Sequence, residues 1–210
     1  MSRRDALLAE MGLAPVWRLR SKGKNPRDLW IELKRAVPAC TACGLHKTRK
    51  QTVLGVGDEH ADWLLIGEAP GAEEDRLGEP FVGQAGRLLD NMLAAIGLER
   101  GENVYIANVL KCRPPGNRNP QPEEVQKCAP HLMRQIELIE PKLIVAMGRV
   151  AAQALLNSDA SIASLRGRLH RYAGVPLIVT YHPAYLLRNL PDKAKAWADL
   201  VFARNTMAGL

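Results

Sequence analysis

The chain has 210 residues, 47% of them hydrophobic, which suits one domain of ordinary size with enough interior to bury a full sheet. No apolar run approaches the roughly twenty residues that a membrane-spanning helix needs, so a membrane protein is excluded. Lysine and arginine number 29 against 22 acidic residues, and the net charge of +7 favours a polyanionic partner such as nucleic acid without establishing one.

The first part of the chain, residues 1–25, is predicted to be a basic arm with one short helix, and a solvated tail is the alternative. Its acidic residues Asp5 and Glu10 argue against a transit peptide. A helix should begin at Pro26, because Asn25 can cap it and proline suits its first position. We expect this helix to end at Pro38 and to open a second region, the domain over residues 26–210.

From residue 62 onward the chain alternates between short apolar runs and amphipathic stretches. The runs predict strands over 62–67, 104–108, 143–147 and 176–181. Helices are expected over 86–96, 122–139, 149–156 and about 192–206, the second of them bent or split at Pro130. This alternation favours an α/β sandwich with a mainly parallel sheet and right-handed crossovers.

Four cysteines are placed as a close pair, Cys40 and Cys43, and a distant pair, Cys112 and Cys128. Two residues between the first pair let both sulfurs turn toward one metal centre. Four thiolates suit either a tetrahedral zinc or an iron-sulfur cluster, and the spacing alone does not choose between them. Two disulfides or four buried thiols are the alternative, which the lack of a secretory segment disfavours.

Three polar segments follow three of the predicted strands, where ligands of an open parallel sheet bind. They begin at Gly67, Asn108 and His182. The first segment, Gly67-Glu-Ala-Pro-Gly71, lacks the lysine of a phosphate loop, and its glycines would let backbone approach a flat ligand. The alternative for Glu68 is a helix cap.

Several side chains near these strand ends have two interpretations each. Phe81 lies between glycines and prolines, as a stacking platform for a planar base or as a core anchor. His182 can donate a hydrogen bond to an oxygen that gains negative charge, although a lone histidine is more often a satisfied surface residue. Leu186 and Leu187, beside Arg188, are either a wedge that enters a base stack or part of a short amphipathic helix.

The cysteine pattern, Gly67-Glu-Ala-Pro-Gly71, Pro80-Phe-Val-Gly83, Asn108 before Lys111-Cys-Arg-Pro-Pro115, and His182-Pro-Ala-Tyr-Leu-Leu-Arg-Asn189 together resemble one family. This family is the iron-sulfur uracil-DNA glycosylases, called family 4, and the resemblance runs from about Pro38 to the C-terminal helix. It implies a three-layer α/β/α sandwich with a four-stranded, mainly parallel central sheet. It also implies a structural 4Fe-4S cluster on Cys40, Cys43, Cys112 and Cys128.

The resemblance further implies a monofunctional enzyme of base excision repair, which flips uracil out of DNA and hydrolyses its N-glycosidic bond. Phe81 would then stack on the base, Asn108 would read its edge, and His182 would stabilise the uracil anion. Further roles fall to Ala69, Pro70 and Gly71 as base contacts, to Leu186 and Leu187 as the wedge, and to Arg188 on the DNA backbone. Ala69 stands where other branches of the superfamily have an aspartate, so Glu68 is the nearest carboxylate to position water.

The expected partner is uracil-containing DNA, double- or single-stranded, bound by a monomer in the cytosol of a bacterium or archaeon, near its nucleoid. Two other classes remain. A non-enzymatic nucleic-acid binding module could use the cysteines for a structural metal. Relatives that capture uracil-DNA covalently carry a glutamine in place of Ala69 and a nucleophilic histidine after the second strand. No histidine stands between Cys112 and Cys128, so turnover is expected.

Overall fold

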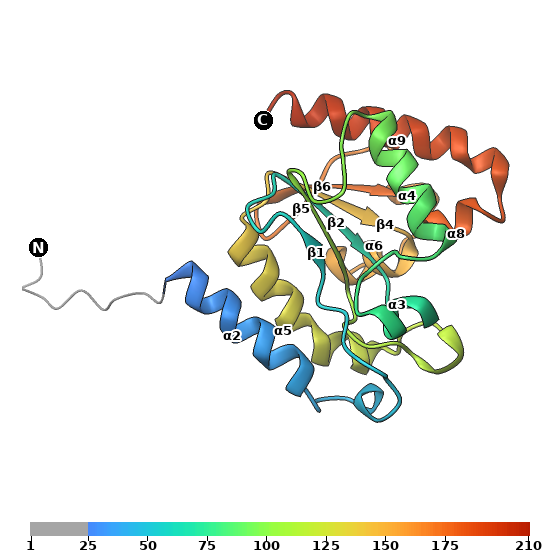
Figure 1. Cartoon of the computed structure of the whole chain (residues 1–210). Coiled ribbons are helices and arrows are strands. Elements are labelled where there is room, and N and C mark those ends of the chain that lie inside the picture. The colour runs from blue at the N-terminus through green and yellow to red at the C-terminus, as the bar shows by residue number, and fades with distance from the viewer. Residues whose placement is uncertain (1–24) are drawn as a thin grey trace, which may run out of the picture.

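The computed structural model describes residues 25–210 (Figure 1). The arm expected over residues 1–25 therefore lies outside the described residues, except for Asn25. Within the described part of the chain, no helix has both the length and the apolar character needed to cross a membrane.

The sheet has six strands in the order β1-β3-β2-β4-β6-β5. The middle four strands are mutually parallel, and β1 and β5 pair antiparallel at the two edges. The bounds are β1 Val56–Gly57, β2 Trp63–Gly67, β3 Val104–Asn108, β4 Leu143–Met147, β5 His170–Tyr172 and β6 Val175–Thr180. The four parallel strands are those expected from the sequence, and the two edge strands correct the expected strand number. The edge strands β1 and β5 are short and only partly buried. Their sequences therefore lack the continuous apolar run that predicts a buried strand.

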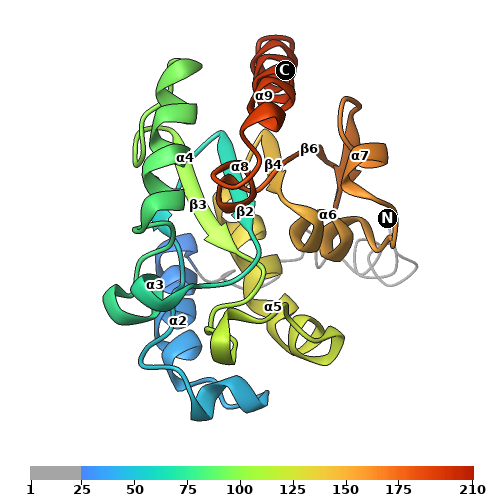
Figure 2. The same cartoon turned by 90° about the vertical axis from the view of Figure 1, so that its right-hand side faces the viewer.

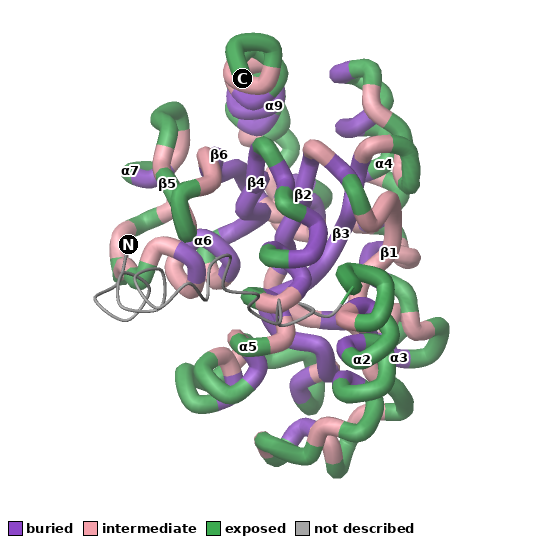
Figure 3. Tube along the Cα trace, turned by 90° about the vertical axis from the view of Figure 1, so that its left-hand side faces the viewer, coloured by how far each residue is buried: buried purple, intermediate pink, exposed green. Residues whose placement is uncertain are grey.

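Helices cover both faces of the sheet (Figures 1 and 2). On one face lie α2 (Pro26–Ala39), α5 (Pro122–Ile139) and α6 (Arg149–Leu156), and on the other α4 (Gln84–Ala95) and α9 (Lys193–Met207). Successive strand residues point to opposite faces, so Leu64 packs in the first core and Leu65 in the second. Figure 3 shows the buried strands between helices whose outer sides are exposed. The three-layer sandwich is therefore confirmed.

Two prolines lie inside helices that the sequence predicted to end or divide there. The side chain of Asn25 accepts a hydrogen bond from the backbone N–H of Arg27 at 3.0 Å, which caps α2 as expected. Pro38 does not end α2, because the last turn closes through Cys40 N–H on the Val37 carbonyl. Likewise α5 continues through Pro130, since its buried side chains on both sides of that residue hold it against the sheet.

Short helical segments complete the fold. They are α3 (Ala72–Leu77), α7 (Ile162–Leu165), α8 (Pro183–Leu186) and the 3-10 turns η1 (Gly44–Lys47), η2 (Pro115–Asn117) and η3 (Leu190–Asp192). Both α3 and α8 lie beyond the carboxyl ends of the parallel strands (Figures 1 and 2). The start of α2 and the end of α9 lie on the opposite side of the molecule (Figures 1 and 3).

Candidate active site and cysteine centre

A cleft of about 690 Å³ lies beyond the carboxyl ends of the parallel strands. Its walls come from the segments after β2, β3, β4 and β6, which the topology brings to one edge of the sheet. Eight of the residues singled out from the sequence line it: Glu68, Ala69, Pro70, Gly71, Phe81, Asn108, His182 and Arg188. The structure thus brings together three segments that are far apart in the chain.

The floor of the cleft is formed where β2 and β3 end side by side. Asn108 is 2% exposed, and its side-chain Oδ1 has no hydrogen-bond partner among the described residues. A Cβ on Gly67 would lie 2.5 Å from that Oδ1 and 2.6 Å from Cζ of Phe81, closer than real contacts allow. Glycine at position 67 therefore lets Asn108 and the Phe81 ring approach each other at the floor.

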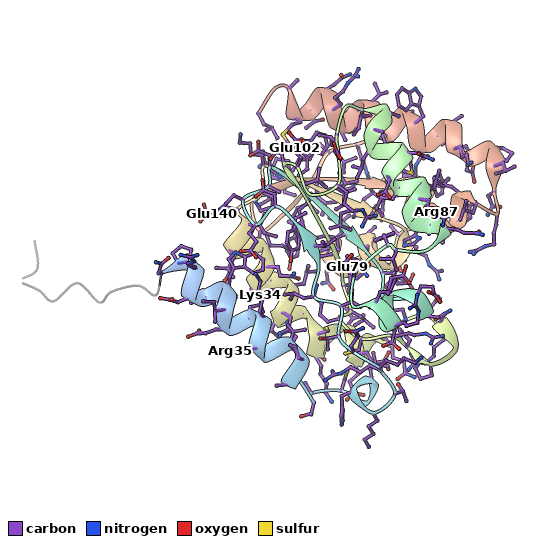
Figure 4. The ribbon with its side chains drawn as sticks, viewed as in Figure 1. Lys34, Arg35, Glu79, Arg87, Glu102 and Glu140 are labelled. Carbon is purple, nitrogen blue, oxygen red and sulfur yellow. The ribbon has the colours of Figure 1, made fainter. Side chains whose placement is uncertain are left out.

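Phe81 combines the two interpretations proposed from the sequence. Its side chain is buried in the core on the α4 side, and its ring also lines the cleft. The ring centroid lies 5.3 Å from that of His182, with the two planes inclined by 28°. Phe81 lies in the loop between α3 and α4; Figure 4 labels Glu79 in this loop and Arg87 in the first turn of α4.

His182 is the N-cap residue of α8, at the end of β6. Its Nδ1 accepts a hydrogen bond from the backbone N–H of Ala184 at 3.1 Å, so the neutral ring carries its proton on Nε2. Burial and, less strongly, the positive charge of Arg188 lower the pKa of His182 from 6.5 to about 4. Near neutral pH this side chain is an uncharged donor, and not the satisfied surface residue of the alternative reading.

Glu68 also lines the cleft and is partly buried. Burial raises the pKa of its carboxyl group above the usual 4.5, and the nearby guanidinium of Arg149 opposes this shift. The N-cap of α3 is Gly71, so the alternative that Glu68 caps this following helix is wrong. The backbone carbonyl of Glu68 accepts from Leu110 N–H at 3.1 Å, which extends the pairing of β2 and β3 into the site.

The segment after His182 forms the short helix α8, as one of the two sequence interpretations expected. Leu186 is 1% exposed and packs in the core on the α4 side, whereas Leu187 is 39% exposed. The role of Leu186 in filling the space left by a flipped base stays a prediction, and it would require this side chain to leave the core under α8. Leu187 is the leucine that faces outward, next to the exposed Arg188.

Sequence reasoning missed several residues of the cleft. Arg149 follows β4 directly and lines the cleft, as do Arg118 and Asn117. The guanidinium of Arg118 is bound to Glu124, with Nη2 2.6 Å from Oε1. The sequence does not predict that the end of β4 belongs to the site, because the two residues after this strand, Gly148 and Arg149, do not form a polar run. The rule that ligands gather at parallel strand ends could have pointed to it.

The four cysteines line one small pocket at the far end of the same edge. They come from the end of α2, the loop before η1, the segment after β3 and the middle of α5, and all four are free thiols. Two disulfides, one of the alternatives, are therefore not formed. Arg49 Nη1 lies 3.1 Å from Sγ of Cys112, and the backbone N–H of Lys111 donates to Sγ of Cys128 at 3.3 Å.

Lys111 connects the cysteine pocket to the cleft. Its side chain is 1% exposed, and its Nζ donates to the backbone carbonyl of Asn108 at 2.7 Å. Burial lowers the pKa of Lys111 to about 8. Lys111 therefore contacts both the backbone of Asn108, through its side chain, and the sulfur of Cys128, through its own backbone N–H.

Comparisons with known proteins identify relatives of the chain. The family model described as the uracil DNA glycosylase superfamily matches residues 54–201. A type-4 uracil-DNA glycosylase of Archaeoglobus fulgidus is 49% identical over 164 residues, covering 74% of this chain and 82% of that protein. Another, of Thermotoga maritima, is 47% identical over 170 residues, covering 80% and 88%. A DNA polymerase of Bacillus phage SP01 is 31% identical over 144 residues, which are 69% of this chain and 16% of the polymerase.

Proposed function

The chain belongs to the uracil DNA glycosylase superfamily and is a DNA glycosylase of the type-4 group, and we propose that its cleft receives a uracil base turned out of DNA. A base inside a duplex is out of reach of any cleft, so the nucleotide must leave the stack before reaction. We propose that a monomer acts on double- or single-stranded DNA.

The observation that carries the base-binding proposal is the unpartnered Oδ1 of the buried Asn108 at the cleft floor. A buried amide oxygen without a partner is costly, and a ligand that donates to it removes that cost. Uracil presents an N–H at N3 and a carbonyl at C4 side by side, which an amide can match with its oxygen and its NH₂ group. We propose that Asn108 reads this edge while Phe81 stacks on the ring and the backbone of residues 69–71 lies against it.

His182 is proposed to act on the leaving base. When the bond between C1′ and N1 breaks, its electron pair passes to the uracil ring and the sugar becomes oxocarbenium-like. The Nε2–H of the neutral imidazole donates to O2 of the uracil anion and stabilises the charge as it develops. Water then adds to C1′, its proton neutralises the uracil anion, and an abasic site and free uracil remain.

Glu68 is proposed to orient the attacking water or to offset the positive charge of the sugar. It is the carboxylate that the segment after β2 supplies where Ala69 offers none, and Arg149 nearby favours its ionised form. On the DNA, Leu187 is proposed to enter the space left by the base. Arg188 and Arg149, both exposed at the cleft, would contact phosphates.

We further propose that Cys40, Cys43, Cys112 and Cys128 hold a 4Fe-4S cluster. Four free thiols that line one pocket are the ligand set that such a cluster takes, and N–H groups of Arg49 and Lys111 point at two of the sulfurs. The cluster would be structural, and the hydrolysis needs no electron transfer.

A covalent product is the second outcome to be considered. In the described structure, His182 is the histidine that lines the cleft, and it is proposed to act on the base. His131 lies on α5 and lines the cysteine pocket instead, so it is not placed to attack C1′. We therefore propose that water traps the sugar and that the enzyme turns over.

Release of labelled uracil from a uracil-containing oligonucleotide tests this function. The wild-type protein should release several equivalents of free uracil and leave no protein-DNA adduct on a denaturing gel. His182→Ala should lower the single-turnover rate by about 10²-fold or more, the usual effect of removing one donor to a developing anion, with little change in DNA affinity. His60→Ala, an exposed histidine outside the cleft, is the control. An unchanged rate for His182→Ala, or a stable adduct, would contradict the proposal.

A further inference from the structure

The backbone of Phe81 is held in a conformation that a bulky residue rarely adopts. Its φ is 56°, in the left-handed region, where the backbone of a residue other than glycine is strained. This conformation aims the ring at the cleft and at His182. A strained residue persists only where its surroundings hold it, so the groups that contact the Phe81 backbone determine whether the ring stays in place.

Arg100 supplies one such contact from the turn between α4 and β3. Its Nη1 donates to the carbonyl of Pro80 and its Nη2 to the carbonyl of Phe81, both at 3.0 Å. Asp90 on α4 accepts from Nε of the same guanidinium at 2.9 Å. The planar guanidinium thus joins two successive carbonyls of the loop to α4, a geometry that suits its fork of donors.

Gly86 restricts the same carbonyl from the other direction. A Cβ at this position of α4 would lie 1.7 Å from the carbonyl oxygen of Phe81. The Phe81 peptide therefore rests directly on the backbone of α4 and is drawn there by Arg100. Arg100 is not among the residues that line the cleft, so its contacts act on the base only through Phe81.

We propose that Arg100 is a positioning residue for uracil recognition, which holds the Phe81 ring in the orientation that stacks on the base. This inference rests on the proposed stacking role of Phe81. Stacking of a base on an aromatic ring contributes affinity only when the ring is already in place, because ordering it on binding would cost part of the gain. Asp90 supports the arrangement by fixing the guanidinium.

Inhibition by free uracil measures this effect without DNA. Arg100→Met should weaken inhibition about tenfold, the order expected for losing much of one base stack, and raise KM more than it lowers kcat. Arg100→Lys keeps the charge but offers a single donor point, so it should fall between wild type and Arg100→Met. Arg134→Met, which removes a comparable exposed ion pair with Glu137 on α5, should leave the inhibition constant unchanged.

A double-mutant cycle separates positioning from general stabilisation. If Arg100 acts through Phe81, then Arg100→Met should weaken inhibition less than twofold in a Phe81→Ala background. Additive losses, or a lowered melting temperature with unchanged inhibition, would overturn the inference. If Arg100→Met does not fold, Asp90→Asn takes its place and should weaken inhibition by free uracil, by less than is expected for Arg100→Met. Wild-type inhibition in Asp90→Asn would then overturn the inference. A Phe81→Ala variant with wild-type inhibition would instead refute the stacking role itself.

Discussion

Two of the residues that line the cleft, Asn108 and His182, are proposed to use side-chain polar atoms on the base. Asn108 Oδ1 is buried without a hydrogen-bond partner among the described residues, and His182, which lines the cleft, has its Nδ1 occupied by the backbone of α8. Such groups are costly in an empty site and favourable in a filled one. At the scale of single residues, the proposed recognition of uracil would depend on polar atoms that the fold leaves free and on a ring that it holds under strain.

The dependence of activity on pH should follow from two of these residues. Burial keeps His182 neutral down to a pKa of about 4, so protonation of this ring does not limit the rate near pH 6. Glu68 has a raised pKa, so it takes up a proton first as the pH falls. If its carboxylate is required, kcat/KM for uracil release should fall on the acid side as Glu68 titrates, above the usual carboxyl value.

Glu68→Gln provides the check on this assignment. The variant should have a lower rate at neutral pH, and the acid limb of its profile should move down toward the titration of His182. An acid limb that stays in place in Glu68→Gln would assign the titration to another group. Because both pKa values belong to the protein without substrate, the profile to compare is that of kcat/KM.

At the scale of elements, the buried strands could be predicted well from the sequence. The runs ending at Gly67, Asn108 and Met147 are apolar on both faces, and their bounds were confirmed within a residue. The edge strands β1 and β5 were missed because pairing at an edge is set by the neighbouring strand and not by a pattern of their own.

The site could be predicted in part. The rule for parallel strand ends and the family resemblance together indicated Glu68, Asn108 and His182, because polar residues cluster there in the sequence. Arg100 could not be found in this way, since its partners are backbone carbonyls that leave no trace in residue types. The choice between Leu186 and Leu187 depends on which side of α8 meets the core, and four residues are too few to show a helical period.

The two leucines of this segment should therefore differ sharply when changed. Leu187→Ala should slow uracil release from a duplex more than from a single strand, because a single strand leaves no stacked gap to fill. Leu186→Ala should instead lower the free energy of unfolding by about 2–5 kcal/mol, the usual cost of deleting a buried leucine side chain. Rates on matched single- and double-stranded substrates and thermal melting test both expectations. Equal effects of Leu187→Ala on the two substrates would exclude the wedge.

At the scale of the whole molecule, the cysteine pocket joins segments that are distant in the chain. It ties the end of α2 to α5 and to the segment after β3, where Lys111 also holds the carbonyl of Asn108. Loss of a centre at this position should therefore disturb both the fold and the cleft floor. The excess of basic residues is also a property of the whole molecule. If basic side chains contact DNA phosphates, the affinity for DNA should fall as the salt concentration rises.

Cys112→Ser should give colourless protein with less iron, a lower melting temperature and weaker inhibition by free uracil. Protein purified without oxygen should be brown and contain about four iron and four sulfide ions per chain, the composition of the proposed cluster. Thr48→Ser, a small change near the same region, should retain iron and colour. A colourless wild type with one equivalent of zinc and full activity would rule out the cluster.

The start of α2 and the end of α9 lie on the side of the molecule away from α3 and α8 (Figures 1 and 3). Polypeptide fused after the end of α9 would leave from the side of the molecule away from the cleft. A partner domain fused there would not cover the surface that we propose binds DNA. A segment similar in sequence to this chain makes up 16% of the phage DNA polymerase, so a similar sequence also occurs as one part of a much larger chain.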